Sequence, residues 1–255
     1  MPPLATAHAA MAAAPDDDTE RLRFFERLAD AELFLLLTEE VTGDRLSPSI
    51  FDTSDGRFVL AFDREERLTA FTEGPAPYAA LSGRAIAGML NGQDIGLGLN
   101  LGVAASAFLV PAGALAWLSD TLEAGPEEFV ERPEHIAPPT GLPEQLVTGI
   151  DTKLASARGL ARMAYLVAVT YPGGRPGHML AFIAPTPGAE GALANAISEV
   201  LVFSGIEAGT LDVAFFAPTD PIAAKLAKHG LRFDLPQVEA MKPPGSDPTK
   251  PPKLR

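Results

Sequence analysis

The sequence predicts an α+β protein made of two small domains, each a mixed β-sheet covered by helices. Three observations lead to this prediction. The 255 residues exceed one typical domain of ~100–200 residues. Segments of helical and of strand periodicity alternate along the chain, and at least one connection has the length of a hairpin. An acidic, proline-rich stretch over residues 121–141 separates the two halves.

These patterns divide the chain into five segments. Residues 1–18 are expected to be a disordered extension, because they are rich in alanine and have no signal-peptide pattern. Residues 237–255 are rich in proline and are expected to be a disordered tail. The two α+β domains are expected over residues 19–121 and 142–236, with residues 122–141 as the linker.

Apolar periodicity, caps and turn signals place the elements in order. In the first half, helices are expected at 19–30, 64–72, 83–90 and from Pro111, and strands at 32–38, 57–63, 78–82, 95–99 and 105–110. In the second half, helices are expected at 142–157, 189–203 and 220–230, and strands at 162–171, 179–185, 210–217 and 231–235. A Pro-Gly-rich turn joins the strands at 162–171 and 179–185 into a hairpin.

Residues 95–119 hold twenty-five positions without a charge, which is long enough to span a bilayer as a helix. Four glycines, Asn100 and Pro111 interrupt this stretch, and acidic residues flank it on both sides. It is therefore expected to form buried strands and the start of a helix, not a membrane span.

Charge and cysteine content exclude several classes of function. The chain has 33 acidic and 20 basic residues, a balance that disfavours nucleic-acid and membrane-surface binding. Residues 1–141 contain 23 acids and 9 arginines, whereas residues 142–255 contain 10 acids and 11 bases. This asymmetry serves solubility, attracts the two halves to each other or reserves the acidic half for a basic partner. With no cysteine, disulfides and cysteine-based sites are excluded, and a cytoplasmic location is expected.

The motifs of common catalytic and cofactor sites are missing. The four histidines are isolated: His8 in the expected extension, His135 in the linker, His178 in the hairpin turn and His229 near a helix C-terminus. The glycines of residues 96–102 do not have dinucleotide-loop spacing, and there is no P-loop or serine-hydrolase elbow. No catalytic residue, metal or cofactor is predicted.

Three polar residues are candidates for a binding surface: Ser82, Arg84 and Asn100. Ser82 lies where a strand passes into a helix, so its hydroxyl either caps the helix or serves as an activated hydroxyl or anion ligand. Asn100 interrupts the most apolar stretch, which suits either a left-handed turn or a ligand contact. The single Trp117 is expected to pack in the core.

The order of these elements resembles the SseB-like family, the enhanced serine sensitivity B proteins of bacteria. The resemblance rests on the strand that ends in Ser82-Gly83-Arg84, the glycine-leucine strand closed by Asn100, and the helix that Pro111 opens. Members usually have Asn-Pro-Gly where this chain has Asn100-Leu101-Gly102. The second half looks like the family's C-terminal domain, so the resemblance covers roughly residues 20–236. It implies two α+β domains and assigns no enzymatic activity, cofactor or catalytic residue.

The leading hypothesis is a non-catalytic binding or regulatory module for a protein partner or a small metabolite, with apolar clefts between the domains as the default site. The alternative is an enzyme whose fold assembles Ser82, Arg84, Asn100 and carboxylates into one site. A nucleophile within hydrogen-bond reach of a base would favour the enzyme, whereas separate structural roles would count against it. A homodimer is a third hypothesis.

Overall fold

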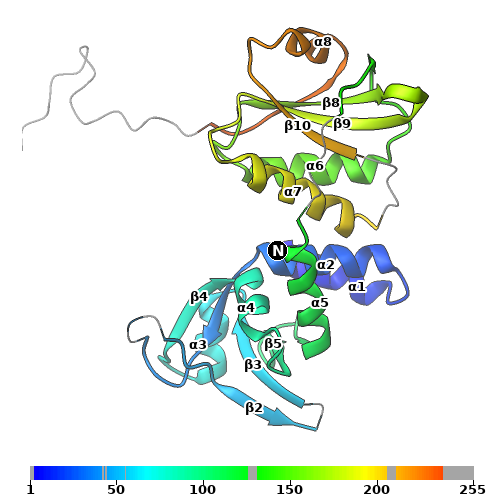
Figure 1. Ribbon diagram of the computed structural model, residues 1–255. Helices are drawn as coiled ribbons and strands as arrows, with labels where there is room; N and C mark the ends of the chain where they lie inside the picture. The colour runs from blue at the N-terminus through cyan, green and yellow to red at the C-terminus, as the bar shows by residue number, and fades with distance from the viewer. Residues whose placement is uncertain are drawn as a thin grey trace, which may run out of the picture. The chain divides into compact units, whose positions relative to one another are not determined.

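The computed structural model describes residues 3–41, 43, 45–54, 56–125, 131–205 and 211–237 (Figure 1). The chain forms two compact units, and each contains one mixed β-sheet with helices packed on it. This confirms the predicted α+β class. No helix among the described residues is long and apolar enough to cross a membrane.

The first unit comprises Met1–Glu128 together with Ser198–Glu207. Its sheet has the order β4-β1-β3-β5-β6, with β2 paired to β3 on the same side as β1. The central strands β3 and β5 run parallel, and the other pairs are antiparallel. The strands are β1 (Glu32–Leu36), β2 (Ile50–Thr53), β3 (Gly56–Phe62), β4 (Tyr78–Ser82), β5 (Ile95–Leu99) and β6 (Phe108–Val110).

Four helices and the residues of one sheet face enclose the main core of this unit, whereas α3 covers part of the opposite face. The helices are α1 (Pro3–Ala13), α2 (Asp18–Asp30), α3 (Glu65–Thr72), α4 (Gly83–Leu90) and α5 (Ala112–Glu123). The glycines of β5 serve this packing, because a Cβ on Gly96 would lie 2.6 Å from the carbonyl oxygen of Val110. They are packing residues of a buried strand, and not part of a nucleotide loop.

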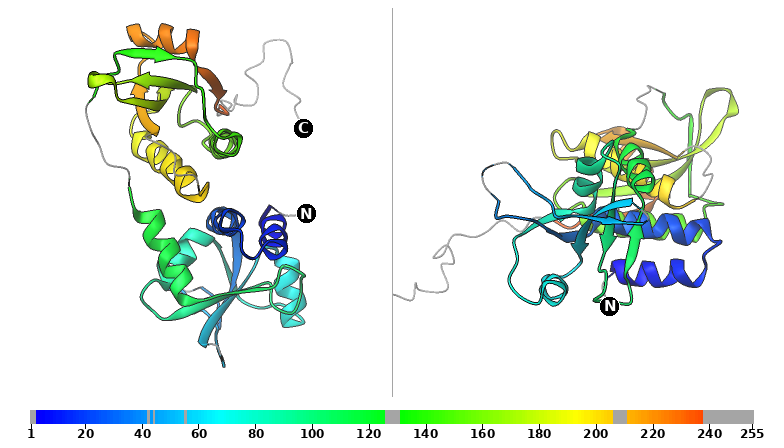
Figure 2. Two further views of the ribbon diagram at one scale, coloured as in Figure 1. Left: turned by 90° about the vertical axis from the view of Figure 1, so that its right-hand side faces the viewer. Right: turned by 90° about the horizontal axis from the view of Figure 1, so that it is seen from below.

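The expectation that residues 1–18 are disordered is wrong. They include α1, which lies beside α2 (Figure 2), and α2 begins at Asp18. Alanine favours the helix, and Leu4, Ala7 and Met11 place one face of α1 in the core. Alanines also occupy the exposed face of α1, so the sequence does not distinguish a buried face from an exposed one. His8 is therefore buried, at edge-on distances of 5.9 Å from Phe24 and 5.5 Å from Phe108.

The second unit comprises Phe129–Ile197 and Ala208–Arg255. Its sheet has the order β10-β9-β8-β11. Strands β7 and β11 pair with the same edge of β8, β11 along its first half and β7 along its second half. Helices α6 and α7 cover one face and α8 the other (Figure 1). The elements are β7 (His135–Ala137), α6 (Glu144–Ser156), β8 (Met163–Thr170), a 3-10 turn (Pro172–Gly174), β9 (Pro176–Ile183), α7 (Glu190–Phe203), β10 (Leu211–Phe216), α8 (Pro221–His229) and β11 (Leu231–Asp234).

Several boundaries differ from the sequence predictions. The stretch 122–141 is not all linker, because β7 lies within it and adds to the sheet by pairing with β8. Residues 126–130 and 238–255, which include most of the expected tail, lie outside the described residues. His178 lies in β9 and not in a turn. The last turns of α7 belong to the first unit, where Phe203 joins the core.

Candidate functional site

Ser82 is the N-cap of α4. Its hydroxyl accepts a hydrogen bond from the backbone N–H of Ala85 at 3.3 Å, and its backbone is extended. The cap satisfies one of the N–H groups that a helix leaves free in its first turn. Of the two roles that the sequence allows for Ser82, the structure shows the cap.

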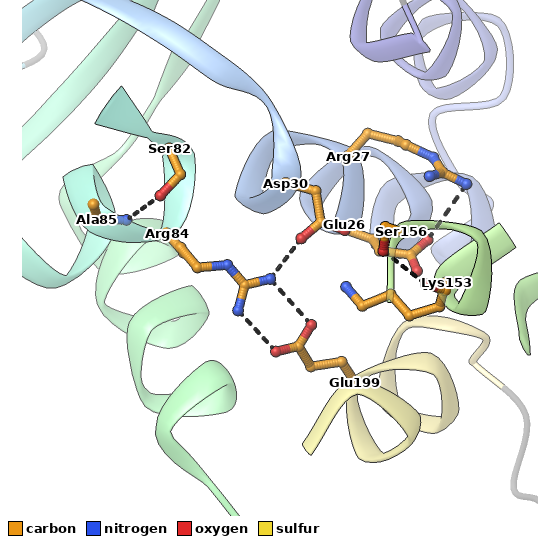
Figure 3. A network of polar contacts seen from close by, with 9 residues as sticks. All are labelled: Glu26, Arg27, Asp30, Ser82, Arg84, Ala85, Lys153, Ser156 and Glu199. Atoms are coloured by element: carbon orange, nitrogen blue, oxygen red, sulfur yellow. Dashed lines mark hydrogen bonds and ion pairs between the residues drawn. The ribbon is translucent and has the colours of Figure 1, made fainter. Parts of the chain in front are cut away.

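Arg84, in the first turn of α4, is held between two carboxylates (Figure 3). Its guanidinium donates to Asp30 at 2.5 Å and to both carboxylate oxygens of Glu199 at 3.0 and 3.2 Å. The pKa of Arg84 is raised, first by the hydrogen bond to Glu199, while burial opposes the rise. Glu199 is buried, and this two-pronged pairing fixes it in place. The guanidinium is thus already bound within the protein.

Asn100 is fully buried and has a left-handed backbone with φ of 51°. Its side-chain oxygen accepts from the backbone N–H of Asp63 at 3.1 Å, and its amide donates to the hydroxyl of Ser106 at 3.1 Å. Arg67 joins the same network, donating to Asp63 at 2.6 Å and to Ser106 at 3.3 Å. These bonds tie together the ends of β3 and β5, so Asn100 acts as the turn residue that the sequence allowed.

The three candidates therefore do not form one site. Each side chain has its own set of hydrogen-bond partners, and each set stabilises a different part of the fold. The geometry gives no support to a catalytic site assembled from Ser82, Arg84 and Asn100. Among the described residues, no group of three histidine or acidic side chains is placed to hold a metal ion. Trp117 is also less buried than expected: 40% of it is exposed, with its ring edge-on to Phe25 and Phe203.

A different surface of the first unit is the outer edge of β2 (Ile50–Thr53), which we call the β2 edge. All four residues are exposed, and the exposed fractions of Ile50 and Phe51 are 49% and 38%. Their side chains lie on opposite faces, because Ile50 pairs with Val59 and Phe51 with Phe58 in consecutive positions. Within the described part of the chain, β2 pairs with β3 alone, so its other edge has no strand partner. Figure 1 shows β2 at the margin of this unit.

Aromatic rings and carboxylates extend this surface over the α3 side of the sheet. The Phe71 ring of α3 lies 6.5 Å from Phe51. Further along, Tyr78 lies edge-on to Phe34 at 5.4 Å. The pKa of Tyr78 is raised, first by the charge of Glu65, with burial, a hydrogen bond to Glu65 and the charge of Glu40 adding to the effect. The negative potential at Tyr78 would favour a cation there.

Sequence reasoning missed this surface. The Asp55-Gly56 turn signal marked a hairpin before β3, but the short run Ile50-Phe51 did not stand out as a strand. The apolar character of these two residues would have predicted burial. The structure places them on opposite faces of the sheet, and both remain exposed. The signal that would have indicated this strand is the pair of large apolar residues Ile50-Phe51 a few positions before the Asp55-Gly56 turn.

Fold and surface together define a two-unit α+β protein whose first unit exposes apolar residues on a strand with no outer partner among the described residues. Residues 6–117 match the family model of the SseB protein N-terminal domain. The first unit therefore contains an SseB N-terminal domain, and the matched residues run from α1 into α5. The match does not extend to the second unit, so the SseB C-terminal domain expected there stays a prediction. Comparisons with curated proteins and with solved structures gave no match.

Proposed function

We propose that this protein is a binding module whose first unit takes up a basic, extended segment of a partner protein, which adds as a strand along the β2 edge. The observation that supports this most directly is the exposure of Ile50 and Phe51 on a strand whose outer edge has no partner in the described residues. Proteins normally protect such edges with charge, proline or a covering element, because a bare edge pairs with other chains. An extended peptide gains backbone hydrogen bonds from such an edge and specificity from its alternate side chains.

The charge of the surroundings selects a basic partner. Glu40 and Glu65 make the potential at Tyr78 negative, and residues 1–141 as a whole contain 23 acids against 9 arginines. A second copy of the chain would bring two such acidic surfaces together, whereas a segment with lysine or arginine neutralises them. Aromatic rings beside the carboxylates also suit cationic side chains. The cysteine-free sequence suits a reducing compartment, and we place this binding in the cytoplasm.

The test measures binding of a fluorescein-labelled nine-residue peptide that alternates lysine and valine, by fluorescence anisotropy. Saturable binding is expected for this peptide and not for one that alternates glutamate and valine. Phe51→Lys should weaken binding by about tenfold or more, because it removes an apolar contact and places a charge on the edge. Leu231→Lys is the matched control, since Leu231 is 42% exposed on a strand of the second unit and the charge change is the same.

Three results would overturn the proposal. One is the absence of saturable binding by the lysine peptide. Another is an equal effect of Phe51→Lys and Leu231→Lys, which would show a general charge attraction. The third is self-association of the wild-type protein that Phe51→Lys abolishes in sedimentation experiments, since the edge would then bind a second copy. Ile50→Lys provides a second variant at an exposed position should Phe51→Lys disturb folding.

A further inference from the structure

The second unit contains a hollow between β7 and α8, with a volume of about 410 Å³. Small-molecule sites typically measure ~300–1,000 Å³, so the hollow is large enough for a compact ligand. One side is formed by the chain at the start of β7, including His135 and Ile136. The other side is one face of α8, where Ile222, Lys225 and His229 recur at helical spacing.

The lining combines apolar and positively charged groups. Ile136 and Ile222 are partly buried against the core under α8, so they form an apolar floor. Lys225 and His229 lie beside it on α8, whereas His135 is next to Ile136 in β7 and its side chain points to the other face of the sheet. Glu134 is the one acidic side chain in the lining.

The basic side chains of the lining are not engaged elsewhere in the described residues. Among the residues that the structure describes, the side chains of Lys225, His135 and His229 have no hydrogen-bond or ion-pair partner. Arg84 of the first unit provides a contrast, because two carboxylates already occupy its guanidinium. A lysine at the rim of a hollow without an internal partner leaves its charge available to an anion from outside.

We infer that this hollow binds a small molecule with an apolar body and one anionic group, a carboxylate or a phosphate. The apolar body would lie on Ile136 and Ile222, and the anion would face Lys225, with the His229 ring beside it. This binding is independent of the β2 edge, since every residue that lines the hollow belongs to the second unit. The two proposals can therefore fail separately.

The probes are benzoate and phenyl phosphate, with benzamide as the uncharged analogue of benzoate. Binding is followed by ¹H–¹⁵N spectra of the full-length protein, and saturable shifts are expected at residues of β7 and α8 for one or both anions. The stronger of the two anions identifies the preferred group. Benzamide should bind more weakly by about tenfold or more, because it lacks the charge that Lys225 would pair with.

Lys225→Met keeps most of the length of the side chain and removes its charge, so it should weaken binding of the anion by about tenfold. Lys228→Met is the matched control, because Lys228 lies on the same helix and does not line the hollow. The inference is overturned if neither anion gives saturable shifts at concentrations up to about 10 mM. It is also overturned if benzamide binds as well as benzoate, or if both lysine variants have the same effect.

Discussion

At the scale of single residues, the polar groups that interrupt the apolar sequence serve to hold the fold. Asn100 combines a left-handed backbone with two hydrogen bonds that connect the ends of β3 and β5. Few residues other than glycine adopt this backbone at low cost, and asparagine is one of them. Its burial follows from this role, because its polar atoms are satisfied inside the protein.

We expect Asn100→Leu to lower the free energy of unfolding by about 3 kcal/mol, because it loses two hydrogen bonds and forces leucine into the left-handed region. Asn100→Gly should cost less, about 1–2 kcal/mol, since glycine keeps the backbone and loses only the bonds. Urea denaturation measures both changes. A glycine variant as stable as the wild type would show that these bonds add nothing.

His8 provides a pH-dependent contribution to stability. Burial against Phe24 and Phe108 lowers the pKa of His8 below its ordinary value of 6.5. The unfolded chain then binds the proton more tightly than the folded protein does. The stabilisation is therefore complete above the unfolded pKa and is lost as the pH falls through and below it.

The variant His8→Leu removes this titration while keeping an apolar side chain in α1. Between about pH 7.5 and pH 5.5, the wild type should lose more unfolding free energy than His8→Leu does, as measured by urea denaturation at each pH. Equal slopes for wild type and His8→Leu would contradict the assignment.

At the scale of elements, one close contact sets how α4 packs on α2. A Cβ on Gly83 would lie 1.8 Å from the carbonyl oxygen of Leu28, so no other residue fits without moving a helix. The N–H of Gly83 also donates to the carbonyl of Ala31 at 2.9 Å. This contact places the first turn of α4, with Ser82 and Arg84, next to the end of α2.

Gly83→Ala should therefore lower the free energy of unfolding by about 3 kcal/mol or more, because backbone atoms must shift. Gly113 in α5 is the matched control, since its Cβ position is open. Gly113→Ala should stabilise the protein by about 0.5–1 kcal/mol through helix propensity. Thermal unfolding compares the two, and similar midpoints would refute the steric account.

Sequence reasoning located elements where the local pattern determines the structure. The strand over 95–99 and the helix over 83–90 match β5 and α4, because apolar runs, a cap and glycine punctuation mark their ends. Elements that depend on distant partners were missed. The three residues of β7 form a strand through pairing with β8, and α1 is recognisable as a packed helix only once its core face is seen.

The same distinction applies to the candidate site. The cap formed by Ser82 and the turn at Asn100 were among the expected alternatives, because both depend on neighbouring backbone. The pairing of Arg84 with Glu199 joins residues 115 positions apart and has no local signal. The exposure of Ile50 and Phe51 likewise depends on what the rest of the chain leaves uncovered.

At the scale of the whole molecule, the two units differ in charge and in the kind of surface that they offer. The first half of the sequence is strongly acidic, and β2 of its unit has no outer strand partner among the described residues. The hollow of the second unit instead has Lys225, which has no ion-pair partner in the described part of the chain. We expect the two to bind different classes of ligand, an extended basic segment at the β2 edge and a small anion in the hollow. The central claim concerns the first of these.

The most direct test of that claim is amide hydrogen exchange of the full-length protein with and without the lysine–valine peptide. An added strand would form hydrogen bonds with the outer edge of β2, so exchange should slow at those amides of residues 50–53 whose N–H groups point away from β3. Exchange in β11, an exposed strand of the second unit, should not change. Slower exchange at residues 50–53 alone is the predicted result. Unchanged exchange there in the presence of saturating peptide would contradict strand addition at the β2 edge.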